Sequence, residues 1–426
     1  MVIDTGPLTI LGLLVAKTGM EICLSVLNLR EGERNRGVVP TPYRNMIGPQ
    51  DYEKSLNYTA AKERFGILTE AFDALILVAL VLGGLPWIYG WLSGKLPDGM
   101  GWDAMLLILL MLILSIPGLP FEWWKQFRLE EKFGFNKSTQ GLWVMDKFKG
   151  VVLMVILTWP PLVALLWVFE KFGSIWWIWG FVLFFGLQLV MMIIYPMWIL
   201  PLFNKLSPLP DEDLRKSLME LADRAGFKAK TIQVIDGSKR STHSNAYFTG
   251  FGKFRRIVLF DTLIEHLSPR ELLAVLAHEI GHYKKGHIPQ RLVVSAVMAF
   301  GGFWFIHWLQ EQPWLQLEFG FSDVGGRPDF LPALLLFGLF SGVFIFWLGP
   351  FFNFWSRKNE YEADAFARDV MNDSQSLVTA LRQLHTKNLS NLVPHPTYSF
   401  FHYSHPTLLE REKALSQKGK KKGQEL

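Results

Sequence analysis

The sequence contains one short group of side chains that could bind a metal ion and use it for hydrolysis. His278 and His282 stand four residues apart in His-Glu-Ile-Gly-His, and Glu279 follows the first histidine. On a helix, residues four apart project from the same face, so both imidazoles could bind one ion. A bound zinc ion would lower the pKa of a water towards about 7, and Glu279 could take its proton as the water attacks a carbonyl. The motif therefore predicts zinc-dependent cleavage of an amide bond, with Glu279 returning the proton to the departing amine.

The local sequence predicts that this motif lies on a buried helix. Residues 271–282 are rich in strong helix formers, Ser268 is a suitable N-cap, and Pro269 stands at the first helical position. The turns before the motif are almost wholly apolar, which favours a buried site over two solvated surface histidines. A pattern this short also arises by chance, so the prediction depends on a third ligand.

The best candidate for the third ligand is Glu360. Glu360 and Asp364 stand four residues apart in an alanine-rich helical segment, so one carboxylate could bind zinc while Asp364 holds a ligating histidine. Glu362 would point elsewhere and is the weaker alternative. His287 lies five residues after His282, roughly 140 degrees further round a helix. We therefore expect His287 to be a substrate-side or structural residue rather than a ligand.

Composition places these residues in a membrane protein. Half of the residues are hydrophobic, and only 19% are charged, below the roughly 25% of soluble domains. The single cysteine, Cys23, excludes an internal disulfide and a zinc site built from several thiolates. Apolar runs long enough to cross a bilayer occur at residues 8–29, 72–92, 104–124, 151–172, 175–200, 292–309 and 331–352. The sequence therefore predicts seven membrane helices.

The first of these runs and the charges between the runs bear on topology. The first run carries Lys17 and Glu21, so an amphipathic surface helix is the alternative for it. Lysine and arginine gather after the first, third, fifth and seventh runs, which predicts a cytoplasmic C-terminus and an external N-terminus. The net charge of +5 lies beside apolar segments, which favours a lipid bilayer as the partner and no nucleic acid.

The pattern divides the chain into four parts. Residues 1–204 would hold spans one to five with their cytoplasmic loops. Residues 205–288 would form a cytoplasmic-side protease region, with a helix over 208–224 opened by Ser207 and Pro208, short strands at 231–235 and 257–260, and the helix of the motif. Residues 289–355 would hold spans six and seven, and 356–426 a helical region with the third ligand and a basic tail. The fold class is mainly α, with a small α/β zinc-protease region that carries a short sheet.

Four segments in this order resemble one known family. They are Ala277-His-Glu-Ile-Gly-His282 followed by His287, the segments 356–367 and 238–250, and His402-Tyr-Ser-His405-Pro-Thr-Leu-Leu-Glu-Arg411. Together they look like the type I CAAX prenyl endopeptidases, multi-span membrane zinc metalloproteases of the gluzincin type. The resemblance extends over nearly the whole chain.

The resemblance implies a fold and further site residues. Seven helices would surround a large water-filled chamber, with one Zn²⁺ per chain near the cytoplasmic side and Glu360 as its third ligand. Asn245 and Ala246 would lie on an edge strand that pairs with the substrate backbone. His405 and Arg411 would face the substrate near the metal. We expect His405 to stabilise the oxyanion, while Arg411 could instead hold local structure.

The resemblance also implies a class of substrate. Eukaryotic members remove the last three residues of prenylated proteins, so we expect a peptide or prenylated protein as partner and a chain that acts as a monomer. A eukaryotic member would lie in the endoplasmic reticulum membrane and a bacterial one in the inner membrane. Two alternatives stay open at this point: a quality-control protease for membrane proteins without prenyl specificity, and a non-catalytic membrane scaffold or transporter.

Overall fold

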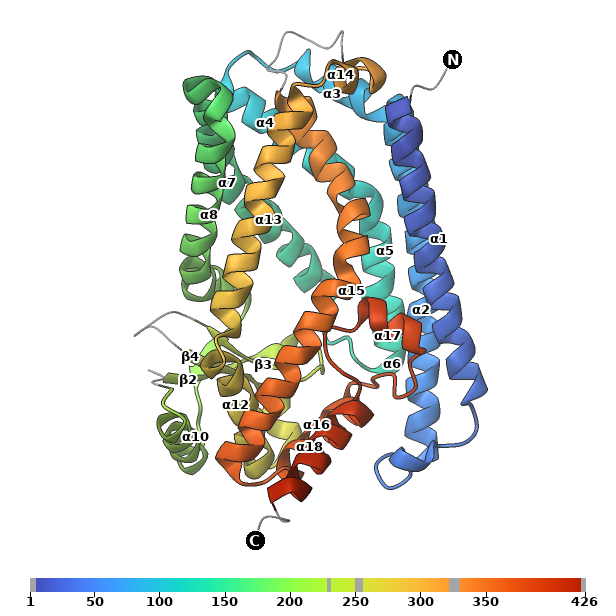
Figure 1. Cartoon of the computed structure of the whole chain (residues 1–426), viewed down its shortest axis with the longest axis vertical. Coiled ribbons are helices and arrows are strands. Elements are labelled where there is room, and N and C mark those ends of the chain that lie inside the picture. Colours follow the sequence, from blue (N-terminus) through green and yellow to red (C-terminus); the bar gives the residue numbers. More distant parts are fainter. Residues whose placement is uncertain (1–4, 228–230, 250–255, 322–329, 423–426) are drawn as a thin grey trace.

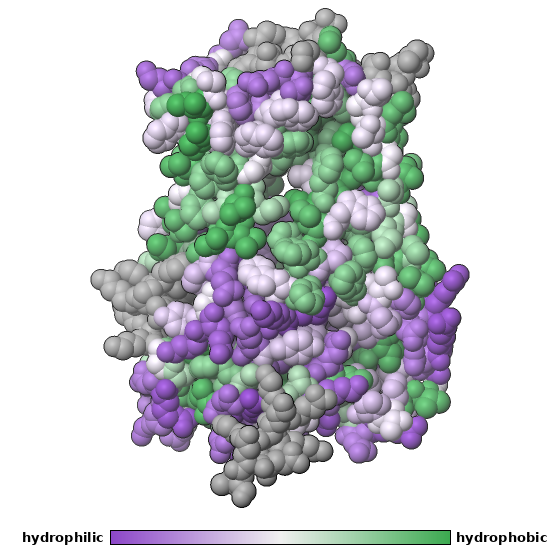
Figure 2. Space-filling model, viewed as in Figure 1, coloured by the Kyte–Doolittle hydropathy of each residue, from purple (hydrophilic) through white to green (hydrophobic). Residues whose placement is uncertain are grey.

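The molecule has an apolar helical half and a more polar half that contains a small sheet. The computed structural model describes residues 5–227, 231–249, 256–321 and 330–422. Long helices run along the molecule from the end where α1 begins, and the sheet and shorter helices lie towards the opposite end (Figure 1). On the face that Figure 2 shows, hydrophobic side chains form a band across the first half, with hydrophilic ones at its outer end and over much of the second half. This division is what a protein partly embedded in a bilayer requires.

The first half is built mainly from the N-terminal half of the chain. Its helices are α1 (Thr5–Arg34), α2 (Pro49–Ala79), α3 (Leu85–Ser93), α4 (Met100–Ser115), α5 (Leu119–Trp124), α6 (Glu131–Phe133), α7 (Gln140–Phe172), α8 (Trp176–Ile194) and α9 (Leu200–Phe203). In the described ranges, six helical stretches are long and apolar enough to cross a membrane. The fourth, Gln140–Phe203, contains both α7 and α8, and the chain reverses direction between them near Gly173, whose φ is 53°. With α7 and α8 counted separately, these stretches agree with the seven predicted spans.

The first apolar helix keeps its charges paired inside the protein. Lys17 on α1 lies 2.5 Å from a carboxylate oxygen of Glu70 on α2. Glu21 lies 3.2 Å from Nε2 of His402. Charged side chains within an apolar helix are tolerated when they face the bundle and pair there. The charges that suggested an amphipathic surface helix are thus satisfied by contacts with other helices.

The helices surround a cavity of about 1120 Å³. Side chains of α1, α7, α8, α13 (His287–Gln310), α14 (Pro313–Glu318) and α15 (Phe330–Met371) line it. Most of the lining is apolar, including Phe303, Leu336 and Phe340. Figure 2 shows the surface hollowed near the middle of the hydrophobic half.

The second half begins with a four-stranded mixed sheet in the order β1-β2-β4-β3. Its strands are β1 (Leu206–Pro208), β2 (Thr231–Ile235), β3 (Ala246–Thr249) and β4 (Arg256–Phe260). β2 and β4 are parallel, whereas β1 and β3 pair antiparallel at the two edges. The predicted strands at 231–235 and 257–260 are therefore present. Gly250, the last residue of the segment 238–250 that contributes to the family resemblance, lies outside the described residues.

The helix expected from residue 208 begins later in the structure. α10 spans Glu212–Arg224, and the side chain of Asp211 caps it by accepting from the backbone N–H of Leu214. Ser207 and Pro208 belong to β1 instead. Serine and proline also suit the start of a helix. The pairing of β1 with β2 makes these residues a strand instead, and the local sequence does not show that pairing.

The site is held between α12 (Pro269–Lys284) and α15, which pack against each other. α15 is one continuous helix of 42 residues that extends from the apolar half into the polar half (Figure 1). It joins the predicted seventh span to the predicted helical segment after residue 356. The remaining helices are α11 (Asp261–His266), α16 (Gln375–Lys387), α17 (Pro396–His402) and α18 (Leu408–Lys422).

Candidate metal centre

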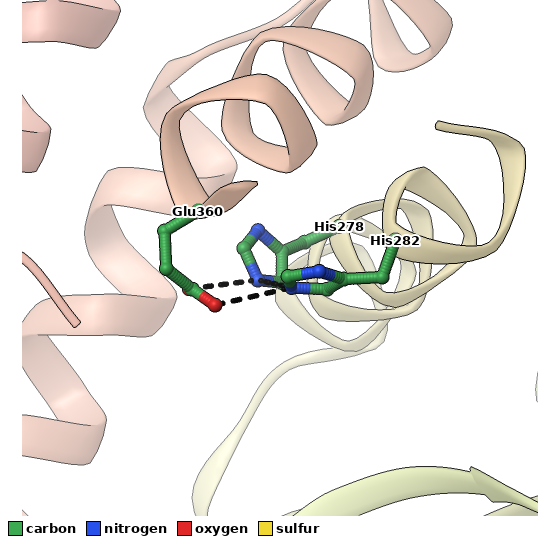
Figure 3. A group of neighbouring side chains, drawn as sticks. All are labelled: His278, His282 and Glu360. Atoms are coloured by element: carbon green, nitrogen blue, oxygen red, sulfur yellow. Dashed lines mark hydrogen bonds and ion pairs between the residues drawn. The ribbon is translucent and has the colours of Figure 1, made fainter. Parts of the chain in front are cut away.

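Two histidine side chains of α12 point towards one position beside α15. The helix begins with a capping box, in which the side chains of Ser268 and Glu271 each accept from the other's backbone N–H. This fixes the start of the helix and places His278 and His282 on the face turned to α15 (Figure 3). His278 is buried and His282 partly so. The predicted N-cap and the predicted common face are both present.

Glu360 on α15 completes a group with the spacing of a metal site. Nε2 of His278 and Nε2 of His282 lie 3.2 Å apart. Oε2 of Glu360 lies 3.4 Å from Nε2 of His278, and Oε1 of Glu360 lies 3.2 Å from Nε2 of His282 (Figure 3). A tetrahedral zinc ion about 2.0–2.1 Å from each ligand atom requires those atoms to be about 3.4 Å apart. The three side chains therefore have the spacing that such an ion needs.

A buried atom without a partner also fits a metal. Oε2 of Glu360 is fully buried and accepts no hydrogen bond. A buried carboxylate oxygen in that state is costly unless a cation binds it. Two imidazoles and one carboxylate form the ligand set of many catalytic zinc sites. In the described residues, His278, His282 and Glu360 are thus a group that could hold a metal ion.

The close approach of the two helices depends on Gly281. A Cβ atom added at Gly281 would lie 2.9 Å from the Cα and 3.0 Å from the backbone oxygen of Ala363 on α15. Because the neighbouring atoms are backbone, they cannot move aside as a flexible side chain can. The glycine within the motif therefore lets α12 approach α15 closely enough for the histidines to reach Glu360. The sequence alone did not reveal this requirement.

Asp364 and Arg411 support His278 from behind. Nδ1 of His278 lies 2.8 Å from Oδ1 of Asp364. The guanidinium of Arg411, from α18, donates to both oxygens of Asp364. Both side chains are buried, and this pairing turns Nε2 of His278 towards the ligand group. Arg411 thus contacts Asp364, which is compatible with the alternative that it holds local structure.

The same carboxylates control the protonation of His278. Burial lowers the pKa of the imidazole, but the Asp364 carboxylate, 2.8 Å from Nδ1, and the Glu360 carboxylate outweigh it and raise the pKa to about 9. In the metal-free protein His278 therefore carries a proton at neutral pH. A metal ion must displace that proton when it binds.

His287 supports His282 in a similar way. Nδ1 of His282 and Nδ1 of His287 lie 2.9 Å apart, and Nε2 of His287 lies 3.3 Å from a carboxylate oxygen of Glu362. If Nε2 of His282 is a metal ligand, its Nδ1 carries the proton and donates to His287. His287 is buried behind the ligand. Sequence reasoning missed Glu362 as its partner, because their contact joins two distant parts of the chain.

Glu279 and His405 lie beside the ligand group. Burial raises the pKa of the Glu279 carboxyl above its ordinary value, and Glu360 is one of the charges that act on it. Nε2 of His405 lies 3.5 Å from an oxygen of Glu360, and the side chain is exposed. Within the described residues, the structure thus gathers a free carboxyl and an accessible imidazole next to the three candidate ligands.

The two residues expected on an edge strand are also close to α12. Ala246 begins β3, Asn245 directly precedes it, and the backbone oxygen of Asn245 accepts from the N–H of Phe260. β3 forms an edge of the sheet and contacts α12. One side of β3 therefore faces away from β4, next to the helix that carries the histidines.

Comparisons with known proteins agree over nearly the whole chain. Residues 28–205 match the family model for the CAAX prenyl protease N-terminal part with five membrane helices. Residues 208–418 match peptidase family M48. The boundary between the two matches falls at β1.

Individual relatives and a solved structure give the same result. CAAX prenyl protease 1 of Saccharomyces cerevisiae is 38% identical over 413 residues, covering 90% of each chain. The human CAAX prenyl protease 1 homolog is 32% identical over 426 residues, covering 88% of each chain. The crystal structure of S. mikatae Ste24p superposes with a TM-score of 0.89 at 36% identity, covering 97% of this chain and 99% of that one. The chain is therefore a multi-pass integral membrane metallopeptidase that belongs to the CAAX prenyl protease 1 family within peptidase family M48.

Proposed function

We propose that this protein is a zinc endopeptidase that cleaves the C-terminal residues of prenylated CAAX proteins. The observation that carries the proposal is the group formed by His278, His282 and Glu360, held with tetrahedral spacing beside Glu279. The names of the yeast, rice and human relatives, all CAAX prenyl proteases, support the substrate class. Zinc fits better than magnesium or calcium, because those ions prefer sites made wholly of oxygen ligands.

Each side chain near the group has a distinct proposed role. His278, His282 and Glu360 would hold the zinc ion, which would supply a Lewis acid for the scissile carbonyl and a water of lowered pKa. The Glu279 carboxylate takes a proton from the attacking water and passes it to the departing amine. The raised pKa of Glu279 suits this exchange, since a group that both takes and gives a proton works best near the working pH. His405 donates a hydrogen bond to the oxyanion that develops on the carbonyl.

Four further residues have positioning roles in this proposal. Asp364 fixes the ring of His278, and Arg411 neutralises and holds Asp364. His287 and Glu362 fix the ring of His282. Such partners keep the ligating nitrogens aimed at the metal and set which nitrogen carries the proton.

The substrate backbone would bind along β3. An edge strand offers unpaired N–H and C=O groups, and an extended peptide can add to it as a further strand. β3 starts at Ala246 and contacts α12, so a peptide paired with it would run close to His278 and His282. Asn245 and Ala246 would then contact the residues around the scissile bond.

The location of the protein follows from its relatives and its charges. The named relatives come from yeast, plants and animals, which supports the endoplasmic reticulum membrane over a bacterial one. The segments that hold most of the lysine and arginine residues lie at the same end as the metal group (Figure 1), which supports an active site and a C-terminus that face the cytoplasm. All candidate ligands come from one chain, so a monomer with one zinc ion suffices.

The proposal is tested by comparing two peptides with the same CAAX sequence, one farnesylated and one unmodified. We expect faster cleavage of the farnesylated peptide, complete loss of cleavage with a zinc chelator, and recovery on addition of zinc. Equal cleavage of both peptides would support a quality-control protease without prenyl specificity. Cleavage of neither, by protein shown to contain zinc, would contradict the protease proposal.

A further inference from the structure

A cationic cleft lies at the turn between α1 and α2, away from the metal centre. It has a volume of about 910 Å³, and four cations line it: Arg36, Lys54, Arg64 and Lys132. Of the described residues that line it, Glu53 is the one carboxylate. Arg36 is already paired with Glu53 and with Glu33. Among the described residues, the other three cations form no salt bridge, so the cleft has an excess of positive charge.

An apolar groove continues directly from this cleft. It has a volume of about 620 Å³ and shares Ala61 and Arg64 with the cationic cleft. Its other lining residues are Phe65, Leu68, Pro120, Phe121 and Trp124, from α2 and α5. The rings of Phe65 and Trp124 stack with centroids 4.8 Å apart, which holds α5 against α2. The two depressions therefore form one site with a charged end and an apolar end.

The order of side chains along α2 gives this site its direction. Lys54, Asn57, Ala61, Arg64 and Leu68 succeed one another at intervals of three or four residues, so they lie within a sector of about 80° on the helix. From Lys54 to Leu68 the helix rises about 21 Å. The apolar end adjoins the predicted spans at residues 72–92 and 104–124, and the charged end lies beyond them on the polar side. The two ends thus follow the order of headgroup and acyl chain in a lipid whose acyl chain enters the bilayer.

We propose that this site binds an anionic phospholipid. The phosphate and headgroup would lie among Lys54, Arg64 and Lys132, and one acyl chain would lie against Phe65 and Trp124. Cationic pockets between membrane helices on the cytoplasmic side favour anionic headgroups. Trp124 is 44% exposed, and exposed tryptophans at this level are typical of the membrane interface.

Binding there would also hold α2 and α6 together. Lys132 belongs to α6 and the other two cations to α2, so one headgroup would bridge both helices. The opposite face of α2 donates from Ser55 to the backbone oxygen of Ser390, in the chain between α16 and α17. A ligand that binds the folded protein raises its melting temperature in proportion to the logarithm of ligand concentration. Lipid affinity can therefore be measured by thermal unfolding.

The test uses the full chain purified in a neutral detergent and titrated with phosphatidylserine or phosphatidylcholine. The variant combines Arg64→Gln with Lys132→Gln. The control combines Lys95→Gln with Lys216→Gln, which removes the same charge from two exposed positions outside both depressions. We expect phosphatidylserine, but not phosphatidylcholine, to raise the melting temperature of the wild type. The variant should bind phosphatidylserine about 30-fold more weakly, and the control should bind like the wild type.

A second variant and a second probe test the apolar end. Trp124→Ala should weaken phosphatidylserine binding, and glycerophosphoserine, which lacks acyl chains, should bind far more weakly than the lipid to the wild type. Equal weakening in the Arg64/Lys132 variant and the control would show general charge attraction and overturn the proposal. Equal affinities for glycerophosphoserine and phosphatidylserine, or for phosphatidylcholine and phosphatidylserine, would overturn it as well. None of these binding measurements depends on catalytic activity.

Discussion

Replacing Asp364 by Asn tests how much the metal centre depends on the residues behind its ligands. In the wild type, Oδ1 of Asp364 lies 2.8 Å from Nδ1 of His278, and both oxygens accept from Arg411. Asparagine has the same shape, but it lacks the charge and has one acceptor oxygen where aspartate has two. One of these donors therefore loses its partner, and Arg411 stays buried without its main counter-charge.

Two effects of different size follow from this change. Loss of such a histidine partner lowers metal affinity by about 10- to 100-fold. Breaking a buried ion pair on one side costs about 3–5 kcal/mol of folding free energy. The cost should be at the lower end here, because asparagine still accepts one hydrogen bond. We therefore expect weaker zinc binding together with a clear loss of thermal stability.

The assay is competition for zinc with a coloured chelator, followed by thermal unfolding with and without excess zinc. Asp369→Asn is the matched control, since Asp369 lies on the same helix with an exposed side chain and pairs with its neighbour Arg368. The control should keep both wild-type zinc affinity and wild-type stability. If Asp364→Asn bound zinc as tightly as the wild type while remaining folded, the orienting role of Asp364 would be refuted.

Three further predictions concern the same centre. Gly281→Ala should lower folding stability by about 1–3 kcal/mol, because its Cβ would meet the backbone of Ala363. The control Gly150→Ala, whose Cβ would meet nothing within 4 Å, should be neutral or stabilising. Thermal unfolding that showed the reverse order of stabilities would contradict the packing argument. His405→Ala should lower kcat by about 10²- to 10³-fold with little change in zinc content, and near-normal kcat on a peptide would exclude the oxyanion role. The pKa of His278, raised to about 9 in the metal-free protein, means that protons compete with zinc at lower pH. The apparent zinc affinity should therefore fall about tenfold for each pH unit below that value, and an affinity independent of pH between 6.5 and 8.5 would contradict this.

Local patterns in the sequence were sufficient for the candidate ligands and for most of the elements that hold them. A spacing of four residues is meaningful only on a helix, and both the motif of His278 and the segment of Glu360 are helical. The alternation of apolar runs and basic loops indicated the membrane helices. Each of these helices is determined by residues close together in the sequence, so the spacing of their side chains is enough to predict it.

Contacts between distant segments could not be predicted in the same way. The sequence left His287 open as a substrate-side or structural residue, and it did not show the contacts with His282 and Glu362 that the structure contains. Their arrangement depends on how α12, α13 and α15 meet, which no local pattern describes. Likewise the change to polar residues at Ser356 suggested a boundary, although α15 continues through it as a single helix.

The central claim is that Glu279 moves the proton while zinc is held by other side chains, and Glu279→Gln tests it most directly. The measurement is cleavage of a farnesylated CAAX peptide by the variant, together with its zinc content. Glu265→Gln, at an exposed position on the neighbouring helix α11, is the control and should behave as the wild type. The account predicts that Glu279→Gln retains one zinc ion per chain and loses at least about 10²-fold in kcat. Cleavage at the wild-type rate by the zinc-loaded variant would contradict it.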